Sequence, residues 1–419
     1  LADKHQACPY CGFTAPKIKE YVTKEITHSA LTTQKCIIKY RARRYKCSCC
    51  GKTYYEFNPF VFKSQKISIL TVHNILKDLK DFNETFTSVA RRYHVSPTSV
   101  STIFDNHVDI GRNPLPEIIN FDEVYAFKSE KSKYVCVLLD FKKQIPVDVL
   151  PNRKKEYLLN YFQKIPLEER KKVKYACSDM YEVYRDVVHK VFPEAKHLLD
   201  YFHLSQDFHK KMNEVRIKVM KGYKDNKASD EYYLLKKFNW LLFKNPEDED
   251  KYGRLFDVER ERKYNSHFKS YMNYYDLRKK LLEINNDLTI CYSLKLELVD
   301  FYSKSTIDNA QVNLEHLIRS FIDTNIEEMI KFSNNLINWK QEIINSFTIV
   351  GTEYKVEADK GQVVVCNKKV NNAIIENRNK IIKCIKNNAN GYTNWSRFRN
   401  RVMYVLDPNA TFSLEPREK

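Results

Sequence analysis

Two pairs of closely spaced cysteines near the start of the chain constrain its fold more than any other feature. In Cys8-Pro-Tyr-Cys11 and in Cys47-Ser-Cys-Cys50, the outer cysteines are separated by two residues. A tight turn at this spacing directs both sulfurs toward one Zn²⁺ ion, and four such sulfurs complete a tetrahedral structural site. We therefore predict a zinc-binding domain over residues 1–60, in which one structural ion is held by Cys8, Cys11, Cys47 and Cys50.

The residues around these cysteines support the zinc interpretation. Gly12 and Gly51 each follow the last cysteine of a pair, where such a turn favours the positive φ that glycine adopts readily. Four reduced thiols or two disulfides are the alternative. Cys49 is placed to compete with a neighbouring cysteine for the ion. The remaining cysteines show no repeating ligand spacing and are interpreted as packing residues: Cys36, Cys136, Cys177, Cys291, Cys366 and Cys384.

The charge of the chain favours a polyanionic partner. Its 419 residues include 71 lysines and arginines against 53 aspartates and glutamates, which leaves a formal net charge of +18. DNA, RNA and an anionic membrane surface all satisfy this preference, and binding is expected to weaken strongly with salt. No apolar stretch approaches the ~20 residues of a membrane span, and the first residues lack the apolar region of a secretory signal. We therefore expect a cytoplasmic protein without a membrane partner.

The segment between the cysteine pairs has the pattern of a β-strand. Apolar and polar residues alternate over residues 35–46, and arginines are frequent there. We predict that the exposed face of this ribbon presents Arg41, Arg43 and Arg44 to DNA phosphates.

Residues 61–113 have helical spacing and are predicted to form a DNA-binding domain. Ser96 is a good N-cap and Pro97 a good first helical residue, so a third helix is expected to begin there after a tight connection. This arrangement predicts a helix-turn-helix whose last helix faces a major groove. A small helical bundle that only links two domains is the alternative. The residues predicted to face DNA are Thr98, Ser99, Ser101 and Thr102.

From Pro114 onward, strands and helices alternate. Three strands are predicted first, at 117–127, 133–140 and 144–150. Helix, strand, helix, strand and a long helix follow, at 154–163, 173–178, 181–191, 196–199 and from 202. This order is typical of an RNase H-like mixed α/β core. We therefore expect a multidomain α/β protein, with the core at 114–215, an all-α insertion at 216–345, the rest of the core with a hairpin and a glutamate-bearing helix at 346–405, and a tail at 406–419.

Three carboxylates are placed to meet in this core. Asp122 lies in the first predicted strand, where burial of a charged side chain requires a partner or a metal ion. Asp179 follows the fourth strand, which neighbours the first strand in an RNase H-like sheet, and Glu376 lies on the last predicted helix. Three converging carboxylates suit two Mg²⁺ or Mn²⁺ ions acting on a phosphodiester. An ordinary surface residue at a strand end is the alternative for such an aspartate.

Several motifs in this order together resemble the ISL-three family of DDE transposases. They are the two cysteine pairs, the helix-turn-helix, Asn120-Phe-Asp-Glu123, Ser178-Asp-Met-Tyr181, Asp200-Tyr-Phe-His203, Glu376-Asn-Arg-Asn379 followed by Lys383, Gly391-Tyr-x-Asn394 and Phe398-x-x-Arg401. The resemblance spans nearly the whole chain. It implies that Asp122, Asp179 and Glu376 are the catalytic carboxylates and magnesium ligands.

The same resemblance implies roles for further residues. Asp200, His203 and Asn379 are expected to support the active site, and Lys383 and Arg401 to contact DNA. A solvated and partly packed helix is the alternative for the basic tail that contains Arg401. The chain departs from the family pattern where a glycine is frequent, at Asn120 and Asn377. The acidic residues that compete for the metal positions are Glu123, Glu182 and Asp200.

The activity that the resemblance implies is DNA transposition of a bacterial insertion sequence. Such a protein binds the terminal inverted repeats, cleaves DNA with two divalent metal ions and joins the 3′-hydroxyl to target DNA. Strand joining requires two ends to be held together, which implies a homodimer or larger assembly on DNA, associated with the nucleoid. The alternatives are a non-catalytic DNA-binding regulator derived from a transposase, an RNase H-like nuclease without strand transfer, and RNA binding through the cysteine pairs.

Overall fold

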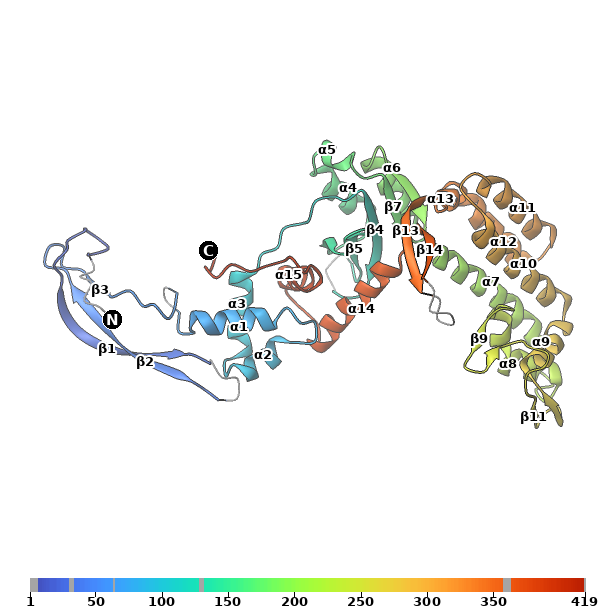
Figure 1. Cartoon of the computed structure of the whole chain (residues 1–419), viewed down its shortest axis with the longest axis horizontal. Helices are drawn as coiled ribbons and strands as arrows, with labels where there is room; N and C mark the ends of the chain where they lie inside the picture. The colour runs from blue at the N-terminus through green and yellow to red at the C-terminus, as the bar shows by residue number, and fades with distance from the viewer. Residues whose placement is uncertain (1–6, 30–33, 63–64, 128–131, 357–362, 418–419) are drawn as a thin grey trace. The chain divides into compact units, whose positions relative to one another are not determined.

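The computed structural model describes residues 7–29, 34–62, 65–127, 132–356 and 363–417 (Figure 1). The chain forms two compact units. The first contains Leu1–Pro116, Asp122–Leu158 and Ile374–Lys419, and the second contains Glu117–Phe121 and Leu159–Ala373. Within the described ranges, no helix is long and apolar enough to cross a membrane.

A three-stranded antiparallel sheet follows the first cysteine pair. Its order is β1-β2-β3, with β1 at Lys17–Thr27, β2 at Ile37–Lys46 and β3 at Thr53–Tyr55. Strand β2 is the predicted one, and β1 pairs antiparallel with it along nearly the whole length of both strands. The rings of Tyr45 and Tyr54 stack at 5.6 Å and pack with Cys8 and Cys47 in a small core. This apolar cluster anchors the cysteines to the sheet.

Three helices follow, each with a side-chain cap at its start. They are α1 at Ile69–Asp78, α2 at Phe86–Arg92 and α3 at Pro97–His107. Ser68, Thr85 and Ser96 accept hydrogen bonds from backbone N–H groups of the first turns, which offsets the unpaired donors of a helix start. The predicted start of the third helix is confirmed. His94 adopts a φ of 54° in the short connection between α2 and α3.

A five-stranded mixed sheet has the order β6-β5-β4-β7-β8. Its strands are β4 Ile118–Val124, β5 Val135–Asp140, β6 Pro146–Leu150, β7 Tyr175–Ser178 and β8 Lys196–Leu199. Strand β5 pairs antiparallel with β6, whereas β7 pairs in parallel with β4 and with β8. The adjacency of the first and fourth predicted strands is therefore confirmed, and the mixed sheet is consistent with an RNase H-like core.

Four helices accompany the strands of this sheet, and the first and third of them contribute rings to an aromatic core. They are α4 at Lys155–Gln163, α5 at Leu167–Arg170, α6 at Glu182–Val191 and α7 at Tyr201–Lys221. The ring of Phe121, from β4, packs within 6.5 Å of the rings of Phe162, Tyr184 and Phe192. All four side chains are almost fully buried. Phe121 therefore anchors the strand on the side opposite to its neighbour Asp122, because successive strand residues point to opposite faces.

The predicted insertion is mostly helical but not all-α. Its helices are α8 Asp230–Lys237, the 3₁₀ segment Asn239–Phe243, α9 Tyr274–Glu283, α10 Asn286–Lys304, α11 Ala310–Asp323, α12 Glu327–Asn338 and α13 Lys340–Asn345. Two hairpins interrupt them: β9 Glu249–Asp250 with β10 Gly253–Arg254, and β11 Lys263–Asn265 with β12 Ser270–Met272. The all-α prediction is wrong here because strands of two or three residues give no period-two signal.

The last part of the chain forms a hairpin and two helices. Strand β13 at Ile349–Val356 pairs antiparallel with β14 at Val363–Lys369, and the turn predicted at 359–361 lies outside the described residues. Helix α14 spans Ala373–Asn388 and α15 spans Trp395–Leu406. Gly391 adopts a φ of 98°, and the side chain of Asn394 caps α15 by accepting from the Arg397 N–H at 2.9 Å.

Candidate zinc site, DNA interface and carboxylate site

The four predicted zinc ligands are brought together. Their sulfurs all lie within 4.8 Å of one another. Cys8 Sγ is 3.7 Å from Cys50 Sγ, and Cys11 Sγ is 3.5 Å from Cys47 Sγ. A Zn–S bond of about 2.3 Å in a tetrahedral site places sulfurs about 3.8 Å apart, so this cluster fits a zinc ion. Cys49, the predicted competitor, is exposed and is not part of the cluster.

Both cysteine turns use the same backbone contacts. The N–H of Gly12 donates to the Cys8 carbonyl at 2.9 Å, and the N–H of Gly51 donates to the Cys47 carbonyl at 3.0 Å. Both glycines have positive φ, at 76° and 69°, as the sequence predicted. A hydrogen bond from the Cys50 N–H lowers the pKa of the Cys47 thiol to about 7. A thiol with this pKa is partly ionised near neutral pH, whereas the pKa values of the Cys11 and Cys50 thiols are raised.

The sequence predicted that the three arginines of β2 share one exposed face, but in the structure they do not. Arg41 is exposed, and its guanidinium lies 4.6 Å from the Tyr21 ring centroid. The Arg43 side chain is 22% exposed and lies 3.7 Å from Glu56 Oε2, whereas Arg44 donates to Glu20 at 2.7 Å. Arg43 and Arg44 are consecutive, so the pleat directs them to opposite faces. Only Arg41 keeps the predicted exposure.

The outward positions of α3 agree with the predicted arrangement. Thr98 and Thr102 are exposed, and Ser99 and Ser101 are half-buried. The Ser101 hydroxyl donates to the Thr98 carbonyl at 3.0 Å. The opposite side of the helix is buried through Val100, Ile103 and Phe104, which form a core with α1 and α2. The four hydroxyl-bearing residues are therefore kept toward the solvent side by burial of the apolar side.

Asp122 is a nearly buried carboxylate held by two hydrogen bonds. It is 9% exposed. Its Oδ2 accepts from Asn379 Nδ2 at 2.8 Å, and its Oδ1 accepts from the Glu123 N–H at 2.8 Å. Asn379 lies on α14 and is itself 4% exposed. The contact fixes the orientation of Asp122 from a helix more than 250 residues away in the sequence.

The same helix presents Glu376 in its first turn. Glu376 precedes Asn379 by three residues, so both side chains lie on one face of α14, and Glu376 is half-buried. The competing Glu123 forms an ion pair with Arg153, on the opposite face of β4 from Asp122. Competing Glu182 is exposed in the first turn of α6. Glu123 therefore does not share a face with Asp122, and Glu182 pairs instead with Arg185.

Asp179 and Asp200 follow neighbouring parallel strands. Cys177 pairs with Leu198 and Ser178 with Leu199, so the aspartates occupy the next position after each strand. Asp179 is half-buried, and Asp200 is 4% exposed. His203 Nε2 lies 3.9 Å from Asp200 Oδ2. The carboxyl ends of β7 and β8 therefore place two acidic side chains at one edge of the sheet.

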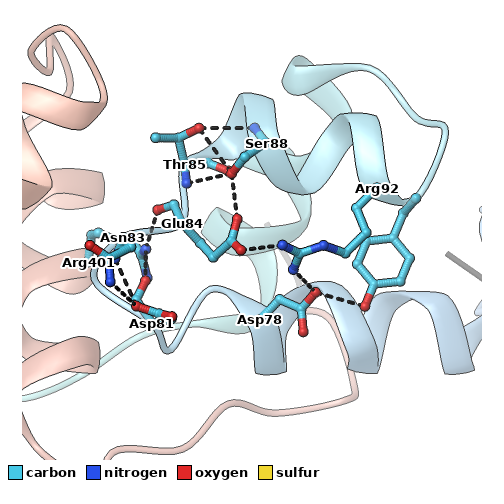
Figure 2. A network of polar contacts seen from close by, with 9 residues as sticks. Asp78, Asp81, Asn83, Glu84, Thr85, Ser88, Arg92 and Arg401 are labelled. Atoms are coloured by element: carbon cyan, nitrogen blue, oxygen red, sulfur yellow. Dashed lines mark hydrogen bonds and ion pairs between the residues drawn. The ribbon is translucent and has the colours of Figure 1, made fainter. Parts of the chain in front are cut away.

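Arg401 has a different role from the predicted one. It is 1% exposed, and its guanidinium donates to the carbonyls of Asp81 at 2.8 Å and Glu84 at 2.7 Å, in the connection between α1 and α2 (Figure 2). Burial lowers the pKa of this guanidinium. A side chain enclosed in this way has no surface to offer to DNA, so the prediction is wrong. Lys383, the other predicted contact of this region, is exposed on α14.

The network around Arg401 continues into the helices. The Glu84 carboxylate pairs with Arg92 and accepts from the Ser88 hydroxyl at 2.6 Å, as Figure 2 shows. Arg92 also pairs with Asp78 at 2.5 Å. Nearby, Arg397 of α15 donates to both oxygens of Asp105 on α3. The contacts of Arg397 and Arg401 were not predicted, because their partners lie 292 or more residues away in the sequence.

A buried amide pair behind the first strand was also missed. Asn120 Nδ2 donates to Asn372 Oδ1 at 2.7 Å, and Asn372 Nδ2 donates to the Phe121 carbonyl at 3.4 Å. Both asparagines are fully buried. The position where the family pattern often has glycine thus has a structural role here. No local signal marks Asn372 as the partner of Asn120.

The comparisons with known proteins agree with this arrangement. A family model of the ISL-three type, described as a transposase, matches residues 119–358, more than half of the chain. The transposase for insertion sequence element IS1001 from Bordetella parapertussis is 19% identical over 409 residues, which cover 97% of this chain and 90% of that protein. The matched family range includes Asp122 and Asp179 and ends before Glu376.

Sheet, motifs and relatives together define a transposase, an enzyme that acts on DNA. The chain belongs to the ISL-three family of transposases.

Proposed function

We propose that this transposase binds the terminal inverted repeats of its element and cuts and joins DNA at one carboxylate cluster. The cluster consists of Asp122, Asp179 and Glu376, and it binds two Mg²⁺ or Mn²⁺ ions. The observation that carries the proposal is the hydrogen bond from Asn379 to the buried Asp122, because the same helix face presents Glu376. A nearly buried carboxylate fixed in this way is typical of a metal ligand and its supporting residue.

The strand register supports the inclusion of Asp179. Ile119 pairs with Ala176 and Asn120 with Cys177 in the parallel β4–β7 ladder. Asp122 and Asp179 each lie two residues beyond the last of these pairs, and we propose on this ground that the two carboxylates act together. Asp200 follows β8 in the same manner, and we propose that Asp200 and His203 support the cluster.

The donor set suits a hard divalent ion. Carboxylate oxygens are preferred by Mg²⁺ over sulfur or nitrogen ligands. When bound, two such ions activate a water or a 3′-hydroxyl and stabilise the leaving oxygen of a phosphodiester. Asp122, Asp179 and Glu376 supply negative charge for this purpose, and Asn379 keeps Asp122 in one orientation. Cleavage and strand joining are both phosphoryl transfers, so one cluster serves both steps.

We propose that the zinc-binding segment and α3 recognise the DNA ends. Zinc is structural there, since all four ligand positions are cysteines and no position is left for a substrate. Arg41 is exposed for a phosphate contact, and the hydroxyls at 98, 99, 101 and 102 face outward from a helix-turn-helix for the major groove. A homodimer or larger assembly on DNA follows from the need to hold two ends.

The experiment is cleavage of a duplex that contains the inverted repeat, with Mg²⁺ or Mn²⁺. We expect Asp179→Asn to remove nicking and strand joining while repeat binding is retained. Glu182→Gln is the matched control, because it neutralises an exposed acid three residues away and is expected to keep full activity. Equal cleavage by wild type and Asp179→Asn would refute the site.

The rival functions are separated by the same assay with precut ends. Joined products support transposition, whereas hydrolysis without joining indicates a nuclease of RNase H type. A wild-type protein that binds the repeat but neither cuts nor joins it indicates a regulator derived from a transposase. Tighter binding to duplex RNA than to the repeat DNA would contradict DNA-end recognition.

A further inference from the structure

The two hairpins of the insertion border a pocket with an unusual lining. The pocket has a volume of about 560 Å³, within the range of small-ligand sites. Residues of α8, of both hairpins and of the first turns of α9 form its wall. Four of the lining residues are tyrosines: Tyr233, Tyr252, Tyr264 and Tyr274.

Two of these rings are exposed although the local backbone is ordered. Tyr252 is 68% exposed and lies in the two-residue turn between β9 and β10. Its N–H donates to Asp250 Oδ1 at 2.8 Å, and Gly253 follows with a φ of 96°. Tyr264 is 58% exposed on β11. Exposed rings on hydrogen-bonded hairpins lose little conformational entropy when a ligand stacks on them.

Planar side chains already pack against three of these tyrosines, and one of these side chains, His267, lies outside the pocket lining. The imidazole of His267 stacks on the Tyr233 ring at 3.9 Å, with an angle of 8° between the planes. The Arg260 guanidinium lies 5.9 Å from the Tyr252 ring centroid and 5.6 Å from that of Tyr274. Arg260 is held there by Asp250 at 2.6 Å and by the Arg254 carbonyl. A planar ligand would therefore meet aromatic faces and a fixed guanidinium.

The charges in the wall exclude a simple phosphate site. Four basic residues are balanced by four acidic ones: Lys237, Arg254, Arg260 and Lys263, and Asp250, Asp257, Glu259 and Glu261. A pocket for a phosphate would need a basic excess. A locally neutral, tyrosine-lined pocket suits an uncharged planar group with polar edges. In a chain with a net charge of +18 that acts on DNA, the planar group of this description is a nucleobase.

We propose that this pocket binds a nucleobase that has left the duplex stack, at or near the DNA end. The inference rests on the proposed function, since it names a second contact with the same DNA. Stacking on an aromatic side chain tolerates any base, because every base has a π-face. The insertion thus holds an unpaired nucleotide while the carboxylate cluster acts on the phosphodiester.

The test is binding of DNA that contains one unpaired 2-aminopurine, whose fluorescence reports stacking. Asp179→Asn protein is used throughout, so that no cleavage occurs. In that background, Tyr252→Ala is expected to weaken binding about 5- to 150-fold, the equivalent of one stacked base. Tyr252→Phe is expected to retain the affinity.

Tyr271 provides a matched control. It is 69% exposed, against 68% for Tyr252, and belongs to the neighbouring hairpin, but it does not line the pocket. The Tyr271 ring packs against that of Tyr264 at 5.4 Å, so Tyr271→Ala is expected to weaken probe binding clearly less than Tyr252→Ala does. Equal losses in both variants, no loss in Tyr252→Ala, or equal binding of an abasic probe would overturn the proposal. In separate assays with Asp179 intact, a Tyr252→Ala protein that binds the unpaired-base probe as wild type does, and still cleaves the repeat duplex, refutes the base pocket alone. Intact base binding without cleavage by wild type refutes the catalytic proposal alone.

Discussion

Replacement of Asn379 by alanine tests the carboxylate site most directly. The side chain of Asn379 donates one hydrogen bond of 2.8 Å to Asp122 in a buried environment. A hydrogen bond to a charged group contributes about 1.5–3 kcal/mol, which equals a factor of about 10 to 150 in an equilibrium or rate constant. Loss of a residue that orients a metal ligand costs about 10- to 100-fold in metal affinity or activity. The two magnitudes agree.

The assay is DNA cleavage as a function of Mg²⁺ concentration. We expect Asn379→Ala to raise the half-saturating Mg²⁺ concentration about 10- to 100-fold, with partial recovery of the rate at high Mg²⁺. Repeat binding is expected to stay unchanged. Asn387→Ala is the control, because Asn387 is exposed on the same helix and the substitution replaces the same residue type by alanine. A wild-type Mg²⁺ dependence for Asn379→Ala, or an equal shift in Asn387→Ala, would refute the positioning role.

Three further predictions address the rest of the molecule. Cys47→Ser or zinc chelation is expected to remove one zinc ion per chain. Specific repeat binding in a gel-shift assay is then expected to be lost, and normal binding by Cys47→Ser would contradict the zinc site. Arg401→Ala should lower the free energy of unfolding by about 3 kcal/mol in urea, whereas Lys383→Ala should change it by less than about 0.5 kcal/mol. If Arg401→Ala instead weakens only DNA binding, the DNA-contact interpretation is restored. Burial lowers the pKa of His197 to about 3, so the unfolded chain takes up a proton below about pH 6.5 before the folded one does. Stability is therefore lost as pH falls through this window, by about 1.4 kcal/mol between pH 7.5 and 5.5, and His197→Gln should remove that part of the dependence.

Local signals in the sequence predicted those features that depend on neighbouring residues. The zinc ligands follow from two-residue spacings, and Gly12 and Gly51 have the expected positive φ. The start of α3 follows from Ser96 and Pro97, since capping is decided within one turn. The adjacency of β4 and β7 follows from the order of elements. These features therefore required no knowledge of tertiary contacts.

Features that depend on distant partners were not predictable in this way. Arg401 resembled a DNA contact because its partners, the carbonyls of Asp81 and Glu84, are more than 300 residues earlier. The carbonyls are backbone groups, so side-chain patterns do not reveal them. Asn394, Phe398 and Arg401 belong to motifs that support the resemblance, yet these residues cap α15, fill a core and hold a loop. In this chain, these motif residues therefore stabilise the fold.

Helix α15 has a consequence for the proposed recognition and cleavage of DNA. Phe398 and Val402 belong to one core with β5 and α14, whereas Tyr404 belongs to the core of α1, α2 and α3. Arg397 adds a two-oxygen contact with Asp105 on α3. Helix α3, which is proposed to read bases, and α14, which presents Glu376, are therefore both packed against α15. On the proposed function, this rigid connection fixes the number of base pairs between the recognised sequence and the cut, whereas it does not restrict the identity of those base pairs.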